Sequence, residues 1–500
     1  MNLAVILDMV AEGMPDRVVV GARDDGLTAA RLREAAQAGA LRLTETGADR
    51  LVFLGPNGPA FPVALFAAAL AGVPFLPLNY RLGDAQLSEV LGRLEGVSLV
   101  VTDAAERVGS APTLTPAELL ALPPAGSDPD RPAFVDPEAV AVLLMTSGTT
   151  AAPKSAVLRH RHLAAYIFGS VEFGSVPDGD ATLVSVPPYH IAAIANILSN
   201  LYSGRRVFYL DAFTPDGWLD AVEQQQITHA MVVPTMLVRI VATLEATDRQ
   251  GPACLRSISY GGAKISGEVV EKALVRFPAT GFVNAYGLTE TASSIAVLGP
   301  DDHREASASA DPAVRARLSS VGRPLPTVEI EVQDGGGRRC PPGVIGDILV
   351  RGDQVAGEYL ETGSGVRANG WFPTRDRGYL DEAGFLFVRG RADDTIIRGG
   401  ENIAPAEIED VLGGHPAVLE CVVAGLPDVE WGQKIAAFVV LRPEGGTDAT
   451  QLRAWVRQRL RGSRTPDEIV FVPELPTTAT GKVLRRELVA QLVDSVESVV

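Results

Sequence analysis

Apolar and polar positions follow two alternating patterns in the first third of the chain. Residues 29–41 have the composition of a helix, whereas residues 50–54, 98–102 and 139–145 are short apolar runs of the kind that form buried strands. Strands of this type that alternate with helices favour parallel sheets covered by helices. We therefore predict an α/β fold with a large N-terminal domain of helix-covered sheets.

One stretch without charge, from Ala60 to Leu78, is almost long enough to cross a bilayer. Because it is interrupted by proline and glycine, we predict a helix and an extended segment, both buried in the core, and no transmembrane span. Residues 103–136 are rich in Pro, Ala and Asp and should connect two layers of the fold over the surface. The interrupting residues are Pro62, Gly72, Pro74 and Pro77.

The pattern changes about two thirds of the way along the chain. Short apolar segments at 328–332 and 345–350, separated by Gly and Pro, indicate a smaller and more antiparallel β-rich subdomain. Further on, strand-like segments at 418–424 and 435–441 precede a helix near 451–460 whose apolar residues share one face. These last elements are expected to form a small, mobile α+β domain that acts as a lid.

Composition limits the classes of function. The chain has 500 residues, 46% hydrophobic and 21% charged, so a folded multidomain protein is expected rather than a disordered or fibrous one. The net charge of −17, without a long Lys/Arg run, argues against nucleic acid as a partner. Cys254, Cys340 and Cys421 are far apart, and the N-terminus lacks the basic flank of a signal peptide. These features favour a reducing, cytoplasmic location.

The first concentration of chemistry is in residues 146–155, Thr-Ser-Gly-Thr-Thr-Ala-Ala-Pro-Lys-Ser, directly after a predicted strand. Small and hydroxylated residues closed by a lysine can surround phosphate oxygens with N–H, O–H and ammonium donors. Gly148 and Lys154 have the spacing of a P-loop, but Pro153 replaces its second glycine and has no N–H to donate. A P-loop is therefore disfavoured, and for this loop alone a plain polar turn stays open.

The loop resembles the phosphate-binding signature of the adenylate-forming superfamily, which contains acyl-CoA synthetases, firefly luciferase and the adenylation domains of peptide synthetases. Two positions depart from the usual pattern, since Ala151 and Ser155 stand where glycine is common. Six further segments match this superfamily in the same order, from about residue 50 to about residue 490. Together they are far more specific than any one of them.

Three of the six segments lie in the middle of the chain. Val186-Pro-Pro-Tyr-His190 resembles the segment whose histidine gates the carboxylate pocket, although an isolated His among apolar residues is more often a core residue. Tyr260-Gly-Gly-Ala263 resembles the loop against which adenine and the acyl group lie, with Lys264 in place of the usual proline. Asn284-Ala-Tyr-Gly-Leu-Thr-Glu290 offers an aromatic ring for the base, a hydroxyl for phosphate and a carboxylate for Mg²⁺.

The other three segments lie toward the C-terminus. Residues 370–376 resemble the ribose-binding segment, with Arg375 where glycine is common. Residues 390–403 resemble the segment that holds a ribose-binding arginine, a hinge and a glycine loop for thioester formation. Residues 476–482 end in Lys482, which matches the lysine that serves adenylate formation. Taken singly, these segments have simpler interpretations: a surface carboxylate, a capped turn and an exposed lysine.

The resemblance implies a set of site residues. Lys482, Glu290, Thr146 and His190 are the expected catalytic residues, and Glu290 is also the expected Mg²⁺ ligand. The expected ATP- and AMP-binding residues are Thr146, Ser147, Gly148, Thr149, Thr150, Lys154, Gly261, Gly262, Ala263, Asn284, Ala285, Tyr286, Gly287, Thr289, Asp376 and Arg391.

The resemblance also implies a division into domains. Asp393 is the expected hinge between an ATP- and carboxylate-binding domain at 1–392, with its β-rich subdomain at about 322–392, and the lid at 393–500. A rotation at this hinge would withdraw Lys482 and bring in the loop around Gly399 and Gly400 for thioester formation.

The implied function is AMP-forming acid–thiol ligation. ATP activates a small carboxylic acid to an acyl-adenylate with release of pyrophosphate, and the acyl group then passes to the thiol of CoA. The expected cofactors and substrates are therefore ATP, Mg²⁺, CoA and the acid. Residues 191–198 and Tyr260 suggest an apolar pocket, which favours an aryl or short-to-medium acyl acid.

Alternatives stay open at this point. A nucleotide- or acyl-adenylate-binding protein with little catalysis is motivated by Ala151, Ser155 and Arg375, and CoA is only the favoured acceptor. An amino-acid-activating module is disfavoured because no acidic motif follows Pro188 to hold an α-amino group. A luciferase-like oxygenase would need a specialised substrate that nothing in the sequence indicates.

Overall fold

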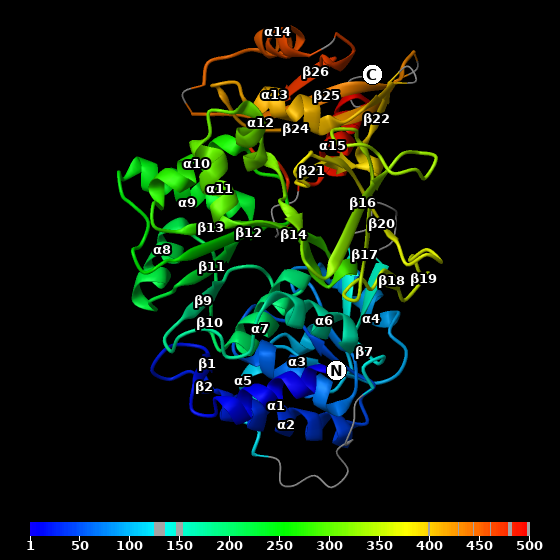
Figure 1. The fold of residues 1–500 in the computed structure, drawn as a ribbon. Coiled ribbons are helices and arrows are strands. Elements are labelled where there is room, and N and C mark those ends of the chain that lie inside the picture. Colours follow the sequence, from blue (N-terminus) through cyan, green and yellow to red (C-terminus); the bar gives the residue numbers. More distant parts are fainter. Residues whose placement is uncertain are drawn as a thin grey trace.

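The computed structural model describes residues 1–124, 136–146, 154–398, 401–428, 430–443, 445–460, 462–478 and 483–497. Figure 1 shows helices α1 (Leu3–Gly13) and α2 (Ala29–Thr46) at the base of the molecule and a small C-terminal unit at the opposite end. Two large sheets lie between them. This arrangement confirms the predicted fold class, a large N-terminal domain of sheets and helices with a smaller C-terminal domain.

The first large sheet comes mainly from the first third of the chain. Its central strands β3, β4 and β5 pair in parallel, as the alternation of helices and apolar runs predicted, and β7 and β8 add an antiparallel hairpin. In spatial order the strands are β19 (Gly363–Ser364), β18 (Glu358–Tyr359), β8 (Lys154–Arg159), β7 (Val140–Thr146), β4 (Phe75–Pro77), β3 (Arg50–Phe53), β5 (Ser98–Val101) and β6 (Thr113–Leu114).

Helix α3 (Ala60–Ala71) is the uncharged segment that could be mistaken for a membrane span. Its residues from Ala60 to Leu70 are buried, and Gly39 of α2 lets the two helices approach, since a Cβ there would lie 2.8 Å from the Cβ of Ala67. The prediction of a buried helix is confirmed. Among the residues that the structure describes, no helix combines the length and apolarity that a membrane span requires.

The described part of the predicted surface connection at 103–136 lies mostly at the surface, where only Val108 and Leu119 are buried. It contains β6 and helix α5 (Pro116–Leu120), because Thr115 begins a capped helix. The Thr115 hydroxyl accepts from the N–H of Glu118, and the Glu118 carboxylate accepts from the N–H of Thr115. This Thr-x-x-Glu pattern was visible in the sequence and was overlooked.

The second large sheet contains most of the middle of the chain. Helices α8 (Pro215–Gln224), α9 (Pro234–Ala246), α10 (Gly267–Arg276) and α11 (Pro300–Ala308) lie along one side of it in Figure 1. In spatial order its strands are β15 (Arg323–Pro324), β14 (Ser293–Leu298), β13 (Gly281–Leu288), β12 (Ser257–Gly261), β11 (His229–Val232), β9 (Ala181–Val184), β10 (Arg206–Tyr209), β1 (Val18–Val20) and β2 (Leu27–Thr28).

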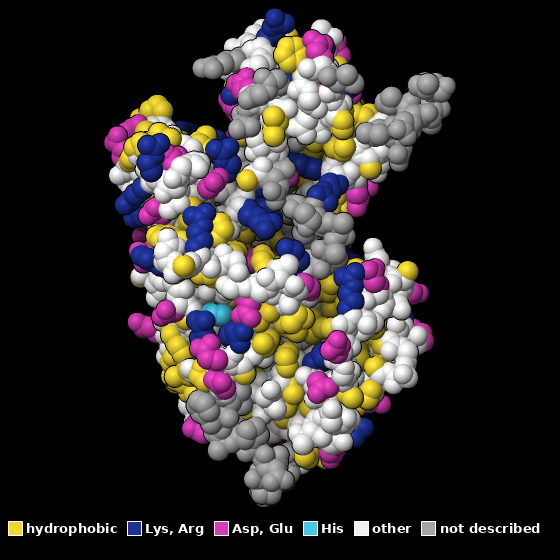
Figure 2. Space-filling model, turned by 90° about the vertical axis from the view of Figure 1, so that its right-hand side faces the viewer, with side chains coloured by type: hydrophobic (Ala, Val, Ile, Leu, Met, Phe, Trp, Pro, Cys, Tyr) yellow, Lys and Arg dark blue, Asp and Glu magenta, His cyan; other side chains and the backbone are white. Residues whose placement is uncertain are grey.

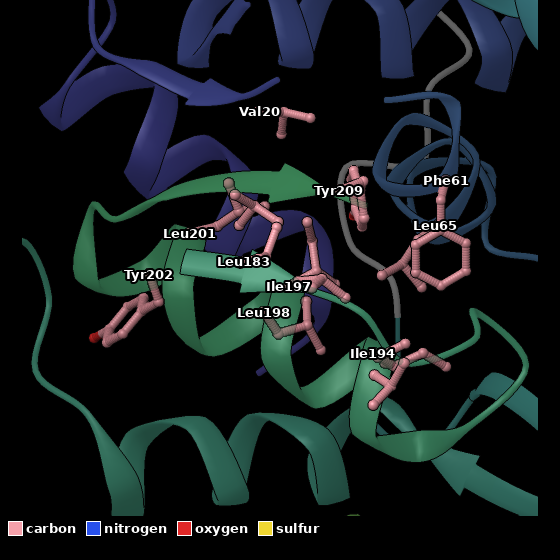
Figure 3. Close-up of a cluster of buried hydrophobic side chains, with 14 of the residues drawn as sticks. Val20, Phe61, Leu65, Leu183, Ile194, Ile197, Leu198, Leu201, Tyr202 and Tyr209 are labelled. Carbon is pink, nitrogen blue, oxygen red and sulfur yellow. The ribbon is translucent and has the colours of Figure 1, made fainter. Parts of the chain in front are cut away.

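Helices α6 (His160–Ser170) and α7 (Ile191–Ser203) join this sheet to the helices at the base of the molecule. Figure 3 shows apolar side chains of α7 beside Val20 and Tyr209 of the sheet and Phe61 and Leu65 of α3. These side chains belong to one continuous core, which fixes the position of α7. The labelled α7 residues are Ile194, Ile197, Leu198, Leu201 and Tyr202.

Two smaller sheet systems follow. The predicted β-rich segments at 328–332 and 345–350 are β16 and β17 of an antiparallel sheet, and the segments at 418–424 and 435–441 are β24 and β25 of the C-terminal unit. The strands are β16 (Val328–Gln333), β17 (Gly346–Gly352), β20 (Phe372–Leu380) and β21 (Leu386–Arg391), then β22 (Ile396–Arg398), β23 (Glu401–Ile403), β24 (Val418–Asp428), β25 (Gly432–Leu441) and β26 (Glu468–Phe471).

The predicted helix near 451–460 is α14 (Ala449–Arg459), which buries Leu452 and Val456 against the C-terminal sheet. Trp455 of the same helix donates its indole N–H to the carbonyl of Val411, 2.8 Å away. The remaining helices are α4 (Asp84–Gly92), α12 (Pro312–Arg315), α13 (Pro405–Gly413) and α15 (Arg485–Glu497).

Two buried histidines at the start of α6 should make the fold sensitive to acid. Their Nδ1 atoms accept backbone N–H groups, His160 from Leu3 at 3.3 Å and His162 from Arg159 at 3.1 Å. Burial lowers the pKa of His160 to about 4 and that of His162 to about 3, from an ordinary value of 6.5. As the pH falls below 6.5, the two histidines bind protons in the unfolded chain but stay neutral in the folded protein. Stability is therefore lost on acidification.

We expect the free energy of unfolding to fall by about 1–2 kcal/mol per histidine between pH 7 and pH 5, measured as a fall in Tm. In His162→Asn the amide oxygen can still accept the N–H of Arg159, and the change of Tm with pH should be smaller than in the wild type. An unchanged pH dependence would show that His162 is protonated without cost.

Candidate active site

A carboxylate, a phenol and a guanidinium meet where β13 approaches the β-rich sheet. The Tyr286 hydroxyl donates to Asp376 Oδ2 at 2.6 Å, and Arg391 Nε lies 3.4 Å from Asp376 Oδ1. Asp376 and Arg391 face each other across β20 and β21. Burial, and next the Asp376 carboxylate, raise the pKa of Tyr286 and keep its hydroxyl a donor. The sequence placed these three residues around the adenine and ribose, and the structure brings them together.

A second group forms around Glu290 in the turn that follows β13. Its backbone carbonyl accepts the N–H groups of Ala356 and Gly357 at 2.9 and 3.0 Å, which fixes this turn against the segment before β18. Its side-chain Oε1 accepts the hydroxyl of Tyr359 at 2.5 Å. The Lys154 ammonium lies 5.3 Å from the centre of the Tyr359 ring. Tyr359 thus links the expected metal ligand to the expected phosphate-binding lysine.

Tyr359 was missed by sequence reasoning because it lies outside the recognised motifs. Burial and then the Glu290 carboxylate raise the pKa of its phenol, while the Arg375 and Arg391 cations nearby oppose that shift. Through its hydrogen bond, Tyr359 belongs to the group around Glu290. No local pattern could have indicated this, because Tyr359 is 69 residues from Glu290.

The ends of the predicted phosphate-binding loop are held by the hairpin of β7 and β8. Thr146 and Lys154 pair directly across it, and the Thr146 hydroxyl donates to the carbonyl of Lys154 at 3.1 Å. Ser155, one of the departures from the family pattern, donates its N–H to the Glu361 carboxylate at 2.9 Å. The other predicted loop residues, Ser147, Gly148, Thr149 and Thr150, lie outside the described residues.

The carboxyl ends of β12 and β13 approach too closely for side chains. A Cβ on Gly261 would lie 2.2 Å from the carbonyl oxygen of Ala285, and Gly262 has a left-handed φ of +86°. A Cβ on Gly287 would lie 1.9 Å from the carbonyl of Ser293. Gly261 and Gly287 thus allow the neighbouring backbone to pack against them, and only at Gly262 is the Cβ position free, with no atom within 4 Å. Ala263 follows directly, and the Asn284 amide donates to the carbonyl of Ser320 at 3.0 Å.

His190 occupies the N-cap position of α7 and is largely buried. Burial lowers its pKa to about 4, so the ring is neutral at pH 7. Its Nε2 is buried and makes no hydrogen bond to the described residues, which fits a polar partner supplied by a substrate. The ring centre of Tyr189 lies 4.7 Å away. Thr289, the predicted α-phosphate contact, is half-buried one residue before Glu290.

The suggestion that Tyr260 lines an apolar pocket is not supported. Its side chain is fully buried, and its hydroxyl lies 2.8 Å from Nε2 of His303 on α11. Side chains alternate along a strand, so Tyr260 points with Ile258 toward the α9–α11 side, while its neighbour Ser259 points the other way. The sequence could not assign the two faces of β12.

The C-terminal unit reaches the larger domain through ion pairs. Lys264, which replaces the usual proline of its motif, pairs with Asp410 of α13, and Arg389 lies 3.4 Å from the same carboxylate. At the base of α15, Arg485 contacts Glu409 at 2.7 Å and Asp394 at 3.3 Å. Within the C-terminal unit, Arg485 thus joins α13 and α15 to the backbone turn at 392–394, which contains the expected hinge. Gly399, Gly400, Lys482 and the side chain of Asp393 lie outside the described part.

Family models match both parts of the chain. The model described as AMP-binding enzyme matches residues 7–360, and the model described as AMP-binding enzyme C-terminal domain matches residues 407–482. A feruloyl-CoA synthase from Amycolatopsis sp. is 35% identical over 452 residues, 88% of each chain.

Two solved structures are similar over nearly the whole chain. The o-succinylbenzoate CoA synthetase MenE from Bacillus subtilis, in complex with its acyl-adenylate intermediate, has a TM-score of 0.83 at 29% identity and 97% coverage of each chain. The same enzyme has been solved with ATP and a magnesium ion. The amide bond synthetase McbA from Marinactinospora thermotolerans has a TM-score of 0.85 at 27% identity, covering 98% of this chain and 99% of the other.

The fold and the grouped residues thus define a nucleotide-dependent, adenylate-forming enzyme. The chain belongs to the AMP-binding enzyme family, as its motifs predicted. It is an AMP-forming acid–thiol ligase of the acyl-CoA synthetase type, which uses ATP, Mg²⁺ and CoA. The alternative of a binding protein with little catalysis is not favoured. The residues present fit these groups: Glu290 supplies a hard oxygen ligand, and the buried Nε of Arg391 makes no hydrogen bond to the described residues.

Removing the Tyr359 hydroxyl should weaken the metal site. In Tyr359→Phe, Glu290 loses the hydrogen bond that orients its carboxylate, and we expect about a 10-fold or larger loss of adenylation or of apparent Mg²⁺ affinity. Initial rates at a series of Mg²⁺ concentrations measure both. Tyr379→Phe is the control, because among the described residues the Tyr379 hydroxyl accepts a single long bond, from Arg389 at 3.3 Å. Equal Mg²⁺ dependence in both variants would contradict this role.

Arg375 adopts a left-handed backbone, with a φ of +64°, at the position where the family pattern has glycine. Both Arg375→Gly and Arg375→Ala remove the guanidinium, but only glycine removes the steric cost of this conformation. The glycine variant should be more stable than the alanine variant by about 1 kcal/mol, compared by Tm. An alanine variant of equal or higher stability would show that the turn is not strained.

Proposed function

We propose that this chain joins a carboxylic acid to AMP within the two groups of residues described above. The observation that supports this most strongly is their convergence: Lys154, Glu290 with Tyr359, and Asp376 with Arg391 come from segments far apart in the sequence. Asp376 accepts the ribose hydroxyls, and Tyr286 lies against the adenine. Gly261, Gly262, Ala263, Asn284, Ala285 and Gly287 form the adjoining wall.

The phosphate end lies at Glu290 and Lys154 in this proposal. Thr146, Ser147, Gly148, Thr149, Thr150 and Lys154 donate to the phosphate oxygens, and Thr289 approaches the α-phosphate. A bound Mg²⁺ held by Glu290 would neutralise phosphate charge. Tyr359 fixes the Glu290 carboxylate, and neutral His190 lies beside the incoming acid without adding a further charge.

Lys482 brings the attacking carboxylate and the α-phosphorus together. The two reactants are anionic, so a compact ammonium between them lowers the barrier to attack, after which pyrophosphate leaves. Thioester formation then needs the same space for the thiol. A rotation of the 393–500 unit about Asp393 withdraws Lys482 and brings in the Gly399 and Gly400 loop.

The acid is proposed to be an aryl or short-to-medium acyl acid, with CoA as the acceptor. Aromatic acids appear in the names of similar proteins, feruloyl-CoA synthase and o-succinylbenzoate CoA synthetase, which supports an aryl acid. The amide bond synthetase shows that the same fold can serve another acceptor. A cytoplasmic location is part of the proposal, in keeping with three cysteines that are free thiols.

The split role of Lys482 is the decisive test. In Lys482→Ala, acid-dependent ATP–pyrophosphate exchange should fall by about 10²–10³-fold, while thioester formation from a supplied acyl-adenylate and CoA should be nearly unchanged. Lys434→Ala is the matched control, since Lys434 pairs with Glu468 within the C-terminal sheet. Equal loss of both half-reactions in Lys482→Ala would refute the assignment.

A further inference from the structure

A row of side chains in the middle of the second large sheet, on the side of α7, is only partly buried, and we call the space over this row the hollow. Met231, Ser259 and Val283 pair in register across β11, β12 and β13, so their side chains share one face. Each is only half-buried, whereas Ala230, Ile258 and Phe282 on the opposite face are almost fully buried. Half-exposed side chains in the interior of a covered sheet mean that α7 does not close on this row. Gly261 and Ala285 continue the row toward the nucleotide site.

Asn196 of α7 faces this hollow. The apolar side chains of α7, labelled in Figure 3, pack into the core, whereas Asn196 is half-buried and its Nδ2 lies 3.8 Å from the Met231 sulfur. A thioether is a weak hydrogen-bond acceptor, so the amide N–H has no strong partner there. An amide donor is therefore presented to a surface on which Met231 and Val283 are apolar and the Ser259 hydroxyl donates to the carbonyl of Ala230.

The orientation of this amide is set by a chain of hydrogen bonds. Arg205 has only donors, and its NH1 bonds to Asn200 Oδ1 at 2.7 Å. Asn200 must then direct Nδ2 toward Asn196, where it donates to Oδ1 at 3.0 Å. Asn196 is left with Nδ2 pointing at Met231. The charge of Arg205 polarises the chain and strengthens the last N–H as a donor.

We propose that Asn196 selects acids that carry a hydrogen-bond acceptor oxygen at the end distant from the carboxylate. This inference rests on the proposed function. His190 and Asn196 are six residues apart on one helix, which corresponds to a rise of about 9 Å. This span suits an aryl acid whose ring is separated from the carboxyl by two carbons and carries an ether or phenol oxygen at its far end. Met231 and Val283 supply the apolar surface for the ring.

Two isosteric acids test this preference. The wild type should activate 4-methoxycinnamic acid about 10-fold or more better than 4-ethylcinnamic acid, measured as kcat/KM in ATP–pyrophosphate exchange, because only the first accepts a hydrogen bond. Asn196→Leu should bring the ratio close to one, mainly by losing the methoxy substrate. Ser199→Ala is the control, since the Ser199 hydroxyl already donates to the carbonyls of Ala195 and Asn196, and its ratio should equal that of the wild type.

A second variant tests the chain without depending on the stability of Asn196→Leu. In Asn200→Asp the new carboxylate can accept from Arg205 but cannot donate to Asn196, so the Asn196 amide should turn and present Oδ1 to the hollow. The enzyme should then prefer 4-hydroxycinnamic acid, a donor, over 4-methoxycinnamic acid. If Asn200→Asp kept the wild-type order of preference between these two acids, the proposed chain of hydrogen bonds from Arg205 to Asn196 would be overturned.

The outcomes separate the two proposals. Exchange with both isosteres at equal rates in the wild type, or a ratio that survives in Asn196→Leu, overturns the role of Asn196 and leaves the proposed function intact. Exchange with octanoate but with none of the cinnamic acids would likewise overturn the role of Asn196 and leave the proposed function intact. No exchange with any acid overturns the proposed function and this inference with it.

Discussion

The repulsion between two anions is the constraint on which this molecule depends. A carboxylate must approach the α-phosphate of ATP, and the chain itself has a net charge of −17. Cations therefore have to be placed locally: Arg391 lies 3.4 Å from Asp376, and Lys154 lies over the ring of Tyr359, whose hydroxyl donates to Glu290. Figure 2 shows Lys and Arg side chains along the narrow region below the C-terminal unit. Positioned charges of this kind need no reorganisation during the reaction.

The same constraint explains why the two domains are joined weakly. A lysine that serves adenylate formation has to leave before a thiol can reach the acyl carbon. The Lys264–Asp410 pair has about two fifths of each side chain exposed (41% and 42%), and such a pair contributes roughly 0–1 kcal/mol. Arg485 acts within the C-terminal unit, where it ties α15 to Glu409 and Asp394. In the proposed rotation, the Lys264–Asp410 pair would therefore be broken at small cost.

Local patterns in the sequence predicted the elements that local physics determines. Apolar runs predicted β3, β5 and β7, and the uncharged stretch predicted the buried helix α3. The ordered motifs indicated the family. Of the motif residues that the structure describes, Tyr286, Asp376 and Arg391 form one group and Lys154 and Glu290 another. In the proposed site these residues contact one ligand, which would explain why motifs specify them.

The contacts that were missed depend on how distant segments come together. Tyr359 reaches Glu290 only because β18 joins the edge of the first sheet beside β8. No pattern in the sequence assigned Tyr260 to a face of its strand, and it was wrongly expected to line the pocket. The observed register shows the row of Met231, Ser259 and Val283 instead. The chain from Arg205 to Asn196 likewise follows from the position of α7 over that row.

Acid-dependent ATP–pyrophosphate exchange in the absence of CoA tests the account most directly. If the carboxylate and the α-phosphate meet at this site, labelled pyrophosphate should enter ATP only when both a suitable acid and Mg²⁺ are present, and later addition of CoA should yield AMP and a thioester. Nucleotide binding without exchange for any acid, or acid-dependent release of ADP in place of AMP, would contradict it.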